Sequence, residues 1–274
     1  MGVLNLTPDS FSDGGRLSHP EQAVEYALRL LRQGAAILDL GAESTRPGSH
    51  AGDPANAAVS AAEEQDRLLP VLEMLLRARP DAIVSVDTYK AATARAALAA
   101  GAEIINDVSG FTWDAAMPAV CAGCGVVLMH TRGRPDEWRE QPRLAPEAVF
   151  AMVRDGLADS LRIAESAGLA PESIVLDPGY GFGKRLEENY ALLRAQSLLL
   201  GLGRPLLAGL SRKSFLRHAL AVRRGREVTS RAAVEHASLA GMTAAILAGA
   251  SIVRVHSVAA AVEAAAVADM LLDA

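Results

Sequence analysis

The chain has 274 residues, of which 50% are hydrophobic and 22% charged, and its formal net charge is -5. This length and apolar content allow a large buried core, whereas the acidic balance disfavours a nucleic acid or an anionic membrane as the main partner. We therefore expect neither of these partners, and we expect any anionic ligand to meet a local cluster of Arg and Lys.

The sequence also indicates where the protein works. Its first residues show no basic segment followed by an apolar one, which predicts a cytoplasmic location. The longest apolar stretch, residues 237–253, is interrupted by polar residues and rich in Gly and Ala, which favours a buried helix followed by a strand over a membrane span. Cys121 and Cys124 form a single CxxC pair, for which we favour an inert role over zinc or redox chemistry.

Short apolar runs alternate with longer helical patterns along the whole chain. Because the runs are apolar at nearly every position, they predict parallel strands that are covered on both faces. The expected strands are 2–6, 36–42, 82–88, 103–109, 125–131, 173–179, 205–211 and 251–257. The expected helices are 20–33, 57–79, 90–100, 114–123, 146–167, 187–200, 230–248 and 258–272.

This alternation is typical of an α/β protein with a (β/α)8 TIM barrel, although the count alone fits a doubly wound open sheet as well. No linker, composition shift or low-complexity tract interrupts the series. We therefore expect a single domain that spans residues 1–274, with the barrel as the favoured architecture.

Most of the expected strands end in polar or charged residues. In chain order these residues are Asn5, Asp39, Glu43, Asp87, Asn106, Asp107, His130, Asp177, Ser211, Arg212, Lys213, Arg254 and His256. In a barrel the carboxyl ends of all strands lie on one face, where active sites are found. A lone Asp at a strand end also caps helices, and for Asp107 this role is an equal alternative.

These residues divide into two chemical groups. The first offers acceptors and one amide: Asp87, Asn106 and Asp177. The second offers cationic donors: Arg46, Lys213, Arg254 and His256. The first group suits a flat heterocycle with several N–H donors, such as a 2-amino-4-oxo ring edge, and the second suits phosphate. We therefore expect a polar heterocycle linked to phosphate as the ligand.

Three Gly-rich loops follow expected strands: "TPDSFSDGG" (7–15), "ESTRPGSHAGDP" (43–54) and "DPGYGFGK" (177–184). The first two are long enough to close over a bound anion and to exclude water from a reaction. For residues 49–55 we prefer a simple surface connection, but not for the "STRPG" segment.

Seven motifs together carry a resemblance to a known family. They are "MGVLNLTPDSFSDGG", "ILDLGAESTRPG", "VSVDTYK", "IINDVSG", "LDPGYGFGK", "GLSRKSF" and "IVRVHSV". In order and spacing, from residue 1 to about 258, this series resembles the dihydropteroate synthases. The resemblance implies a (β/α)8 barrel, usually a homodimer, that uses Mg²⁺. It also implies a transferase that joins 6-hydroxymethyl-7,8-dihydropterin pyrophosphate to p-aminobenzoate and releases pyrophosphate.

The resemblance also implies roles for individual residues. It places the pterin on Asp87, Asn106, Met129, Asp177, Phe182 and Lys213, and the diphosphate on Asn5, Arg46, Arg254 and His256. It assigns the p-aminobenzoate pocket to Thr45, Pro47 and Ser211, adds Gly209 to the substrate-binding set, and makes Asn5 the contact to Mg²⁺. The implied catalytic residues are Asn5, Arg46, Lys213, Arg254 and His256. Asp9, Phe11 and Asp13 would belong to a mobile first loop.

The sequence departs from the family pattern at two places that bear on the expectations. The stretch "MHTRG" adds Arg132 beside the rim, and residues 222–241 lack the customary small-residue pattern before and within the seventh expected helix. The second departure concerns the region that would carry the dimer contact. Neither departure involves the residues of the implied chemistry.

The chemistry of the implied substrates favours one mechanism. Because p-aminobenzoate has a weakly basic aromatic amine, the pterin CH2–O bond should ionise first while cations stabilise the departing diphosphate. We therefore expect a dissociative substitution with ordered binding.

Three alternative functions remain at this point. The first is a pterin-binding methyltransferase acting from methyltetrahydrofolate to a corrinoid protein, which the cationic residues and "STRPG" disfavour. The second is a Schiff-base aldolase using Lys213, disfavoured because this lysine follows the strand end beside Arg212. The third is a noncatalytic pterin-binding protein.

Overall fold

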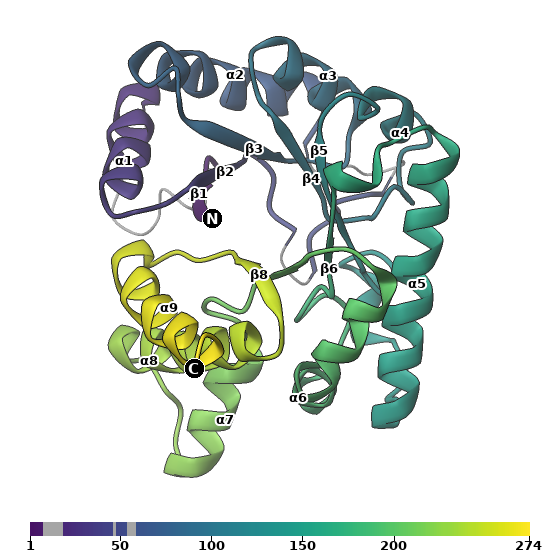
Figure 1. The fold of residues 1–274 in the computed structure, drawn as a ribbon, viewed down its shortest axis with the longest axis vertical. Helices are drawn as coiled ribbons and strands as arrows, with labels where there is room; N and C mark the ends of the chain where they lie inside the picture. Colours follow the sequence, from purple (N-terminus) through teal and green to yellow (C-terminus); the bar gives the residue numbers. More distant parts are fainter. Residues whose placement is uncertain (8–18, 46–47, 54–58) are drawn as a thin grey trace.

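The computed structural model describes residues 1–7, 19–45, 48–53 and 59–274, and its strands form one parallel sheet (Figure 1). The strands are β1 (Gly2–Asn5), β2 (Ile37–Gly41), β3 (Ile83–Asp87), β4 (Ile104–Asp107), β5 (Gly125–Met129), β6 (Ile174–Asp177), β7 (Leu206–Ala208) and β8 (Ala250–Val253). Each strand pairs with the next one along the chain, so the spatial order equals the sequence order. This order is that of a barrel built from successive β/α units.

The sheet closes between its first and last strands. Gly2 forms a parallel bridge with Val255, whose carbonyl accepts the Val3 N–H at 3.0 Å. The Met1 amine donates to the Val253 carbonyl at 2.9 Å. Since these contacts join β1 to the end of β8, the open-sheet alternative is excluded. The (β/α)8 prediction is confirmed.

Helices surround the sheet on its outside (Figure 1). They are α1 (Pro20–Arg32), α2 (Ala61–Ala78), α3 (Ala91–Ala99), α4 (Met117–Val120), α5 (Pro146–Ser166), α6 (Leu186–Ala195), α7 (Ser214–Arg224), α8 (Arg231–Leu247) and α9 (Val258–Leu272). Short 3-10 segments are η2 (Glu137–Arg139), η3 (Pro171–Ser173) and η4 (Gln196–Leu202). In α1 the buried residues Ala23, Val24, Ala27 and Leu30 recur at helical spacing, so this helix turns one apolar stripe to the barrel.

The main core lies between the strands and this layer of helices. Leu38 and Leu40 of β2, Ile105 of β4 and Leu128 of β5 are fully buried and belong to one cluster with the apolar faces of the helices. Burial on both faces explains why these strands are apolar at nearly every position. The polar residues at the strand ends are the exceptions that form the site.

The structure corrects the prediction of eight helices. Within the described residues it contains an additional helix, α7, where a loop was expected. This helix buries Phe215 and Leu216 but is otherwise largely polar or exposed, so its apolar stripe is short. It ends at Gly225, whose φ of 64° is the left-handed conformation typical of a helix end.

Other elements are shorter than predicted. The helix expected at 114–123 is only α4, and the helix expected at 187–200 ends at Ala195 before continuing as η4. The strand expected at 103–109 ends at Asp107, because its carboxylate accepts the N–H groups of Ser109 at 2.8 Å and Phe111 at 2.9 Å. Asp107 therefore organises the turn after β4, and the alternative that it caps the next helix is wrong, because α4 begins at Met117 with Ala116 as its N-cap.

Two further sequence expectations concern membranes and thiols. Across the described part of the chain, every helix is too short or too polar to cross a membrane. Cys121 is buried and Cys124 is half-buried, and both are free thiols.

Candidate active site

Acidic and cationic side chains from distant parts of the chain meet at the carboxyl ends of the strands. Gly209 lies near two of them: a Cβ added there would be 3.9 Å from Asp177 Oδ2 and 3.9 Å from the Cβ of Arg254. Asp177 ends β6 and Arg254 directly follows β8. One small ligand at this mouth can therefore contact both residues.

Arg254 is bound to two carboxylates. Its Nε donates to Asp39 Oδ2 at 2.6 Å, and its Nη2 donates to Asp87 Oδ2 at 2.8 Å. Asp39 is fully buried and also accepts from Ser85 Oγ at 2.6 Å and from Asn106 Nδ2 at 3.2 Å. Buried carboxylates need such partners. The predicted separation of acidic and cationic groups therefore differs from the structure, which places Arg254 within the acidic group.

Burial shifts the pKa values of the groups at this mouth. Burial raises the pKa of Asp87 to about 7, although Arg254 acts in the opposite direction. It also raises the pKa of Asp177, against the effect of the Gly179 N–H that donates to this carboxylate at 2.7 Å. Burial and then Arg254 lower the pKa of Lys213 to about 8. Groups shifted toward neutrality in this way are characteristic of functional sites.

An apolar surface adjoins these charges. The Lys213 ammonium lies 4.0 Å from the centre of the Phe182 ring, which packs edge-on against Trp138 at 5.3 Å. Phe182 also packs against a small buried cluster that contains Met129. A flat ring could stack here while its edge meets the carboxylates.

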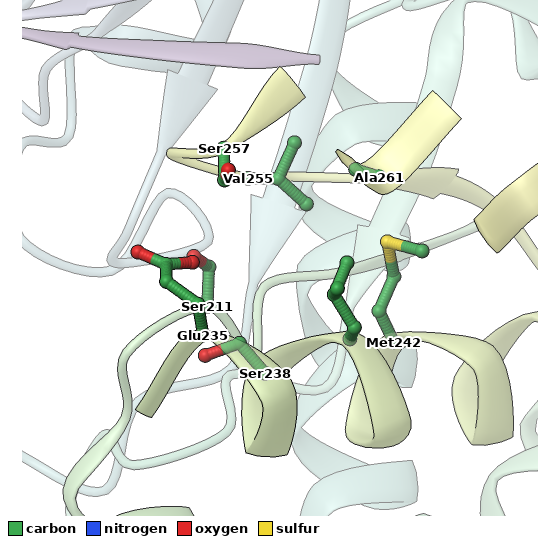
Figure 2. A pocket seen from close by; sticks show the side chains of 8 residues that line it. Ser211, Glu235, Ser238, Met242, Val255, Ser257 and Ala261 are labelled. Carbon is green, nitrogen blue, oxygen red and sulfur yellow. The ribbon is translucent and has the colours of Figure 1, made fainter. Parts of the chain in front are cut away.

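Ser211 and His256 join the loops after β7 and β8. His256 Nδ1 lies 2.9 Å from Ser211 Oγ, and the His256 N–H donates to the same hydroxyl at 3.3 Å. Ser211 also lines a small cavity of about 10 Å³ between α8 and the end of β8 (Figure 2). The positions of these two residues are thus coupled.

Sequence reasoning missed Lys184, which holds the loop after β6. Its ammonium donates to the carbonyls of His130 at 3.0 Å, Gly179 at 2.7 Å and Phe182 at 3.2 Å. Gly179 has a φ of +66°, and a Cβ there would lie 2.0 Å from the His130 oxygen, so only glycine fits. Burial lowers the pKa of Lys184 to about 7. The sequence signal that could have identified Lys184 is its place at the end of the Gly-rich segment 177–184.

A second missed group anchors the loop after β2. The Lys90 ammonium donates to Glu43 and, at 3.3 Å, to Glu64 of α2. Thr93 Oγ1 also donates to Glu64 at 2.7 Å. Glu43 begins the "ESTRPG" segment, so this network fixes the start of the loop that contains Thr45. Asp39, noted only as a polar residue, is likewise more central than expected.

The remaining predicted residues fall into two sets. Asn5 ends β1 opposite Gly41 of β2, and Thr45 lies in the loop after β2. The residues outside the described part of the chain are Asp9, Phe11, Asp13, Arg46 and Pro47.

The amide oxygen of Asn5 is a hard donor that suits Mg²⁺, which commonly takes one or two protein ligands and completes its shell with water and phosphate oxygens. The donor chemistry at this strand end therefore fits the expected metal.

Comparison with known proteins agrees with this geometry. The family model described as "Pterin binding enzyme" matches residues 1–256. The dihydropteroate synthase of Escherichia coli (strain K12) is 40% identical over 275 residues, which cover 100% of this chain and 92% of that protein. The chain belongs to the dihydropteroate synthase family.

Solved structures of this family have the same fold. The Xanthomonas albilineans dihydropteroate synthase with 4-aminobenzoic acid has a TM-score of 0.85 at 39% identity. The same enzyme in complex with 7,8-dihydropteroate has a TM-score of 0.82 at 37% identity. Each comparison covers 100% of this chain and 93% of the other. The sequence-based recognition of the family is confirmed.

Proposed function

We propose that this protein condenses 6-hydroxymethyl-7,8-dihydropterin pyrophosphate with p-aminobenzoate to give 7,8-dihydropteroate and pyrophosphate in folate biosynthesis. It is thus a dihydropteroate synthase, a transferase. The observation that carries the proposal is that Asp177 and Arg254 both lie near Gly209 at one mouth of the barrel. Family membership and the ligands of the Xanthomonas albilineans enzyme support it.

The pterin ring would bind at the acidic side of the mouth. Because the amide nitrogen of Asn106 donates to Asp39, its carbonyl oxygen is oriented as an acceptor for an N–H group of the ring. Asp177 would accept from the amino and ring N–H donors, and the Phe182 and Met129 side chains would pack near the ring plane. Asp87 would contribute through the side of its carboxyl group that Arg254 leaves accessible.

The diphosphate would bind toward the cationic residues. Arg254, Lys213 and His256 would stabilise the negative charge that develops as the CH2–O bond breaks, and the amine of p-aminobenzoate would then attack the resulting cation. Arg46 would join them at the diphosphate, and Ser211, Thr45 and Pro47 would bound the p-aminobenzoate site. Gly209 would admit the substrate, since a side chain there would approach Asp177 and Arg254.

Mg²⁺ is part of the proposal as the metal that neutralises diphosphate charge. Asn5 would be its protein contact. The amide oxygen of Asn5, the residue that ends β1, supports this choice because Mg²⁺ takes oxygen ligands.

The proposal extends to the surroundings of the enzyme. We propose a homodimer that acts in the cytoplasm on these two small molecules. The family resemblance supports the dimer, and analytical ultracentrifugation at micromolar concentration tests it. A monomer across that range would contradict it.

A pyrophosphate-release assay tests the function itself. We expect pyrophosphate only when both substrates are present, with dihydropteroate as the second product. Asp177→Asn should lower kcat/KM by roughly 10- to 100-fold, because a hydrogen bond to a charged group contributes about 1.5–3 kcal/mol. Asp155→Asn, at an exposed ion pair with Arg154, is the matched control that should retain activity. Methyl transfer from methyltetrahydrofolate to cobalamin, without pyrophosphate release, would contradict the proposal.

A further inference from the structure

We infer that Glu235 and Ser238 of α8 are positioning residues for the turn formed by Ser211, Arg212 and Lys213. They hold Arg212 in a left-handed backbone conformation and thereby fix the residues on either side of it. This inference deepens the proposed function and rests on it for its kinetic consequences, but its structural basis is independent.

Arg212 has an unusual backbone conformation. Its φ is 60°, and among the described residues only Phe111 is another non-glycine residue with positive φ. A side chain with a Cβ disfavours this region, so the conformation persists only where surrounding contacts enforce it. Such residues concentrate at functional sites.

Two contacts from α8 enforce it. The Arg212 N–H donates to Ser238 Oγ at 2.9 Å, and Arg212 Nε donates to Glu235 Oε1 at 2.6 Å. The Ser238 hydroxyl itself donates to the Val234 carbonyl at 2.7 Å, which leaves its lone pairs for Arg212. Glu235 and Ser238 are three residues apart and thus share one face of the helix. We call these two contacts the α8 clamp.

The surroundings make the α8 clamp well defined. Figure 2 shows Ser211, Glu235 and Ser238 at one end of the small cavity, with Met242 and Ala261 at the other. The Glu235 side chain is 19% exposed and that of Arg212 is 30% exposed, so the ion pair is partly shielded from water. A shielded pair of this kind restrains geometry better than an exposed one.

Both neighbours of Arg212 belong to the proposed site. Ser211 Oγ lies 2.9 Å from His256 Nδ1, and the Lys213 ammonium lies over the Phe182 ring. The Lys213 N–H donates to the Leu210 carbonyl at 3.2 Å, which completes the turn. If Arg212 relaxed to a negative φ, the chain would change direction between Ser211 and Lys213. The α8 clamp therefore sets the position of Ser211, which we assign to the p-aminobenzoate site, relative to Lys213, which we assign to the pterin site.

Glycine provides the decisive comparison, since it adopts positive φ without strain. Glu235→Ala should lower kcat/KM for p-aminobenzoate about tenfold, because small displacements of positioned groups have effects of this order. In an Arg212→Gly background the same change should have no further effect. Arg212→Ala should be more harmful than Arg212→Gly, because both lose the contact to Glu235 but only alanine keeps the strain of a positive φ. His236→Ala, at an exposed residue of the same helix, is the control and should behave like the wild type.

Two kinetic results would overturn the inference. One is a Glu235→Ala enzyme with unchanged kcat/KM. The other is an equal loss from Glu235→Ala in the Arg212 and the Arg212→Gly backgrounds, which would mean that Glu235 does not act through Arg212. Ser238→Ala, which removes the other half of the clamp, serves as the second variant if Glu235→Ala does not fold.

Hydrogen–deuterium exchange separates this inference from the proposed function. The peptide that contains Arg212 and Lys213 should exchange faster in Glu235→Ala than in the wild type, whether or not either protein is active. Faster exchange with no pyrophosphate release by the wild type would leave the α8 clamp supported and refute the proposed function. Unchanged exchange would refute the clamp.

Discussion

Arg254 links folding and the proposed catalysis in a single side chain. Its removal leaves the buried Asp39 carboxylate without its cation, and breaking a buried ion pair in this way lowers the free energy of unfolding by about 3–5 kcal/mol. Loss of a group that stabilises the transition state costs about 2–4 kcal/mol, or roughly 30- to 1,000-fold in rate. We therefore expect Arg254→Ala to lower both quantities, as measured by urea unfolding and pyrophosphate release.

A double variant separates the two effects of Arg254. Adding Asp39→Asn to Arg254→Ala removes the unpaired charge and should restore much of the stability, but not the turnover. Full turnover in Arg254→Ala would contradict the assignment of this residue to the diphosphate.

Lys184 should make stability depend on pH. Its pKa is lowered by burial to about 7, from an ordinary value of 10.5. Between pH 7 and 10.5 the unfolded chain binds more protons than the folded one, so Lys184 makes the free energy of unfolding rise with pH. This added stability is lost as the pH falls through 7. From pH 7 to 9 the rise is about 2 kcal/mol. Urea unfolding should show this rise in the wild type relative to Lys184→Met, and parallel pH profiles would refute it.

Residue types at the site were predictable, but their partners were not. Polar residues at the ends of apolar runs identified Asp87, Asn106, Asp177 and Arg254 as members of one rim, because strand direction alone brings them together. The pairing of Arg254 with Asp39 joins residues 215 positions apart. Side-chain direction at a closed rim decides that pairing, and no sequence spacing encodes it.

At the scale of the elements, Lys90 connects the start of α3 to α2 and to the loop after β2. Glu43 and Glu64 have side chains only 4% and 1% exposed, so Lys90→Met leaves two buried carboxylates without their cation. We expect a loss of about 3–5 kcal/mol in the free energy of unfolding, measured with urea. The KM for p-aminobenzoate should also rise, because Glu43 begins the loop that holds Thr45.

The exposed pair of Arg77 and Glu73 is the matched control for Lys90. Both of its side chains are more than half exposed, at 73% and 51%, and surface pairs of this kind contribute about 0–1 kcal/mol. Arg77→Met should therefore change stability little. Equal effects of the two substitutions would show that burial of the Lys90 network does not matter.

Elements with strong patterns were predictable from sequence, and weakly patterned ones were not. The strands were located within a few residues because their bodies are continuously apolar. Helix α7 was missed because it buries only Phe215 and Leu216 and carries many polar residues. Ends were placed too late where a side chain starts a turn, as Asp107 does after β4.

At the scale of the whole molecule, we propose that residues 1–274 unfold as one domain. The closed sheet ties the first residues to the last strand, so local loss of either end should disrupt the whole barrel. Trp113 lies in the loop after β4 and Trp138 in η2 after β5, whereas the circular dichroism at 222 nm reports on all helices. The two signals should give the same urea midpoint. Separate midpoints would indicate more than one cooperative unit.

The contacts of Arg254 also bear on inhibitor design. An anionic compound at this mouth has to displace a carboxylate that the guanidinium already holds, so its net gain is only the difference between two charge-assisted hydrogen bonds. A neutral bicyclic compound with N–H donors for Asp177 avoids that exchange. Chemical libraries rich in such compounds are therefore a better starting point against this enzyme than phosphate mimics.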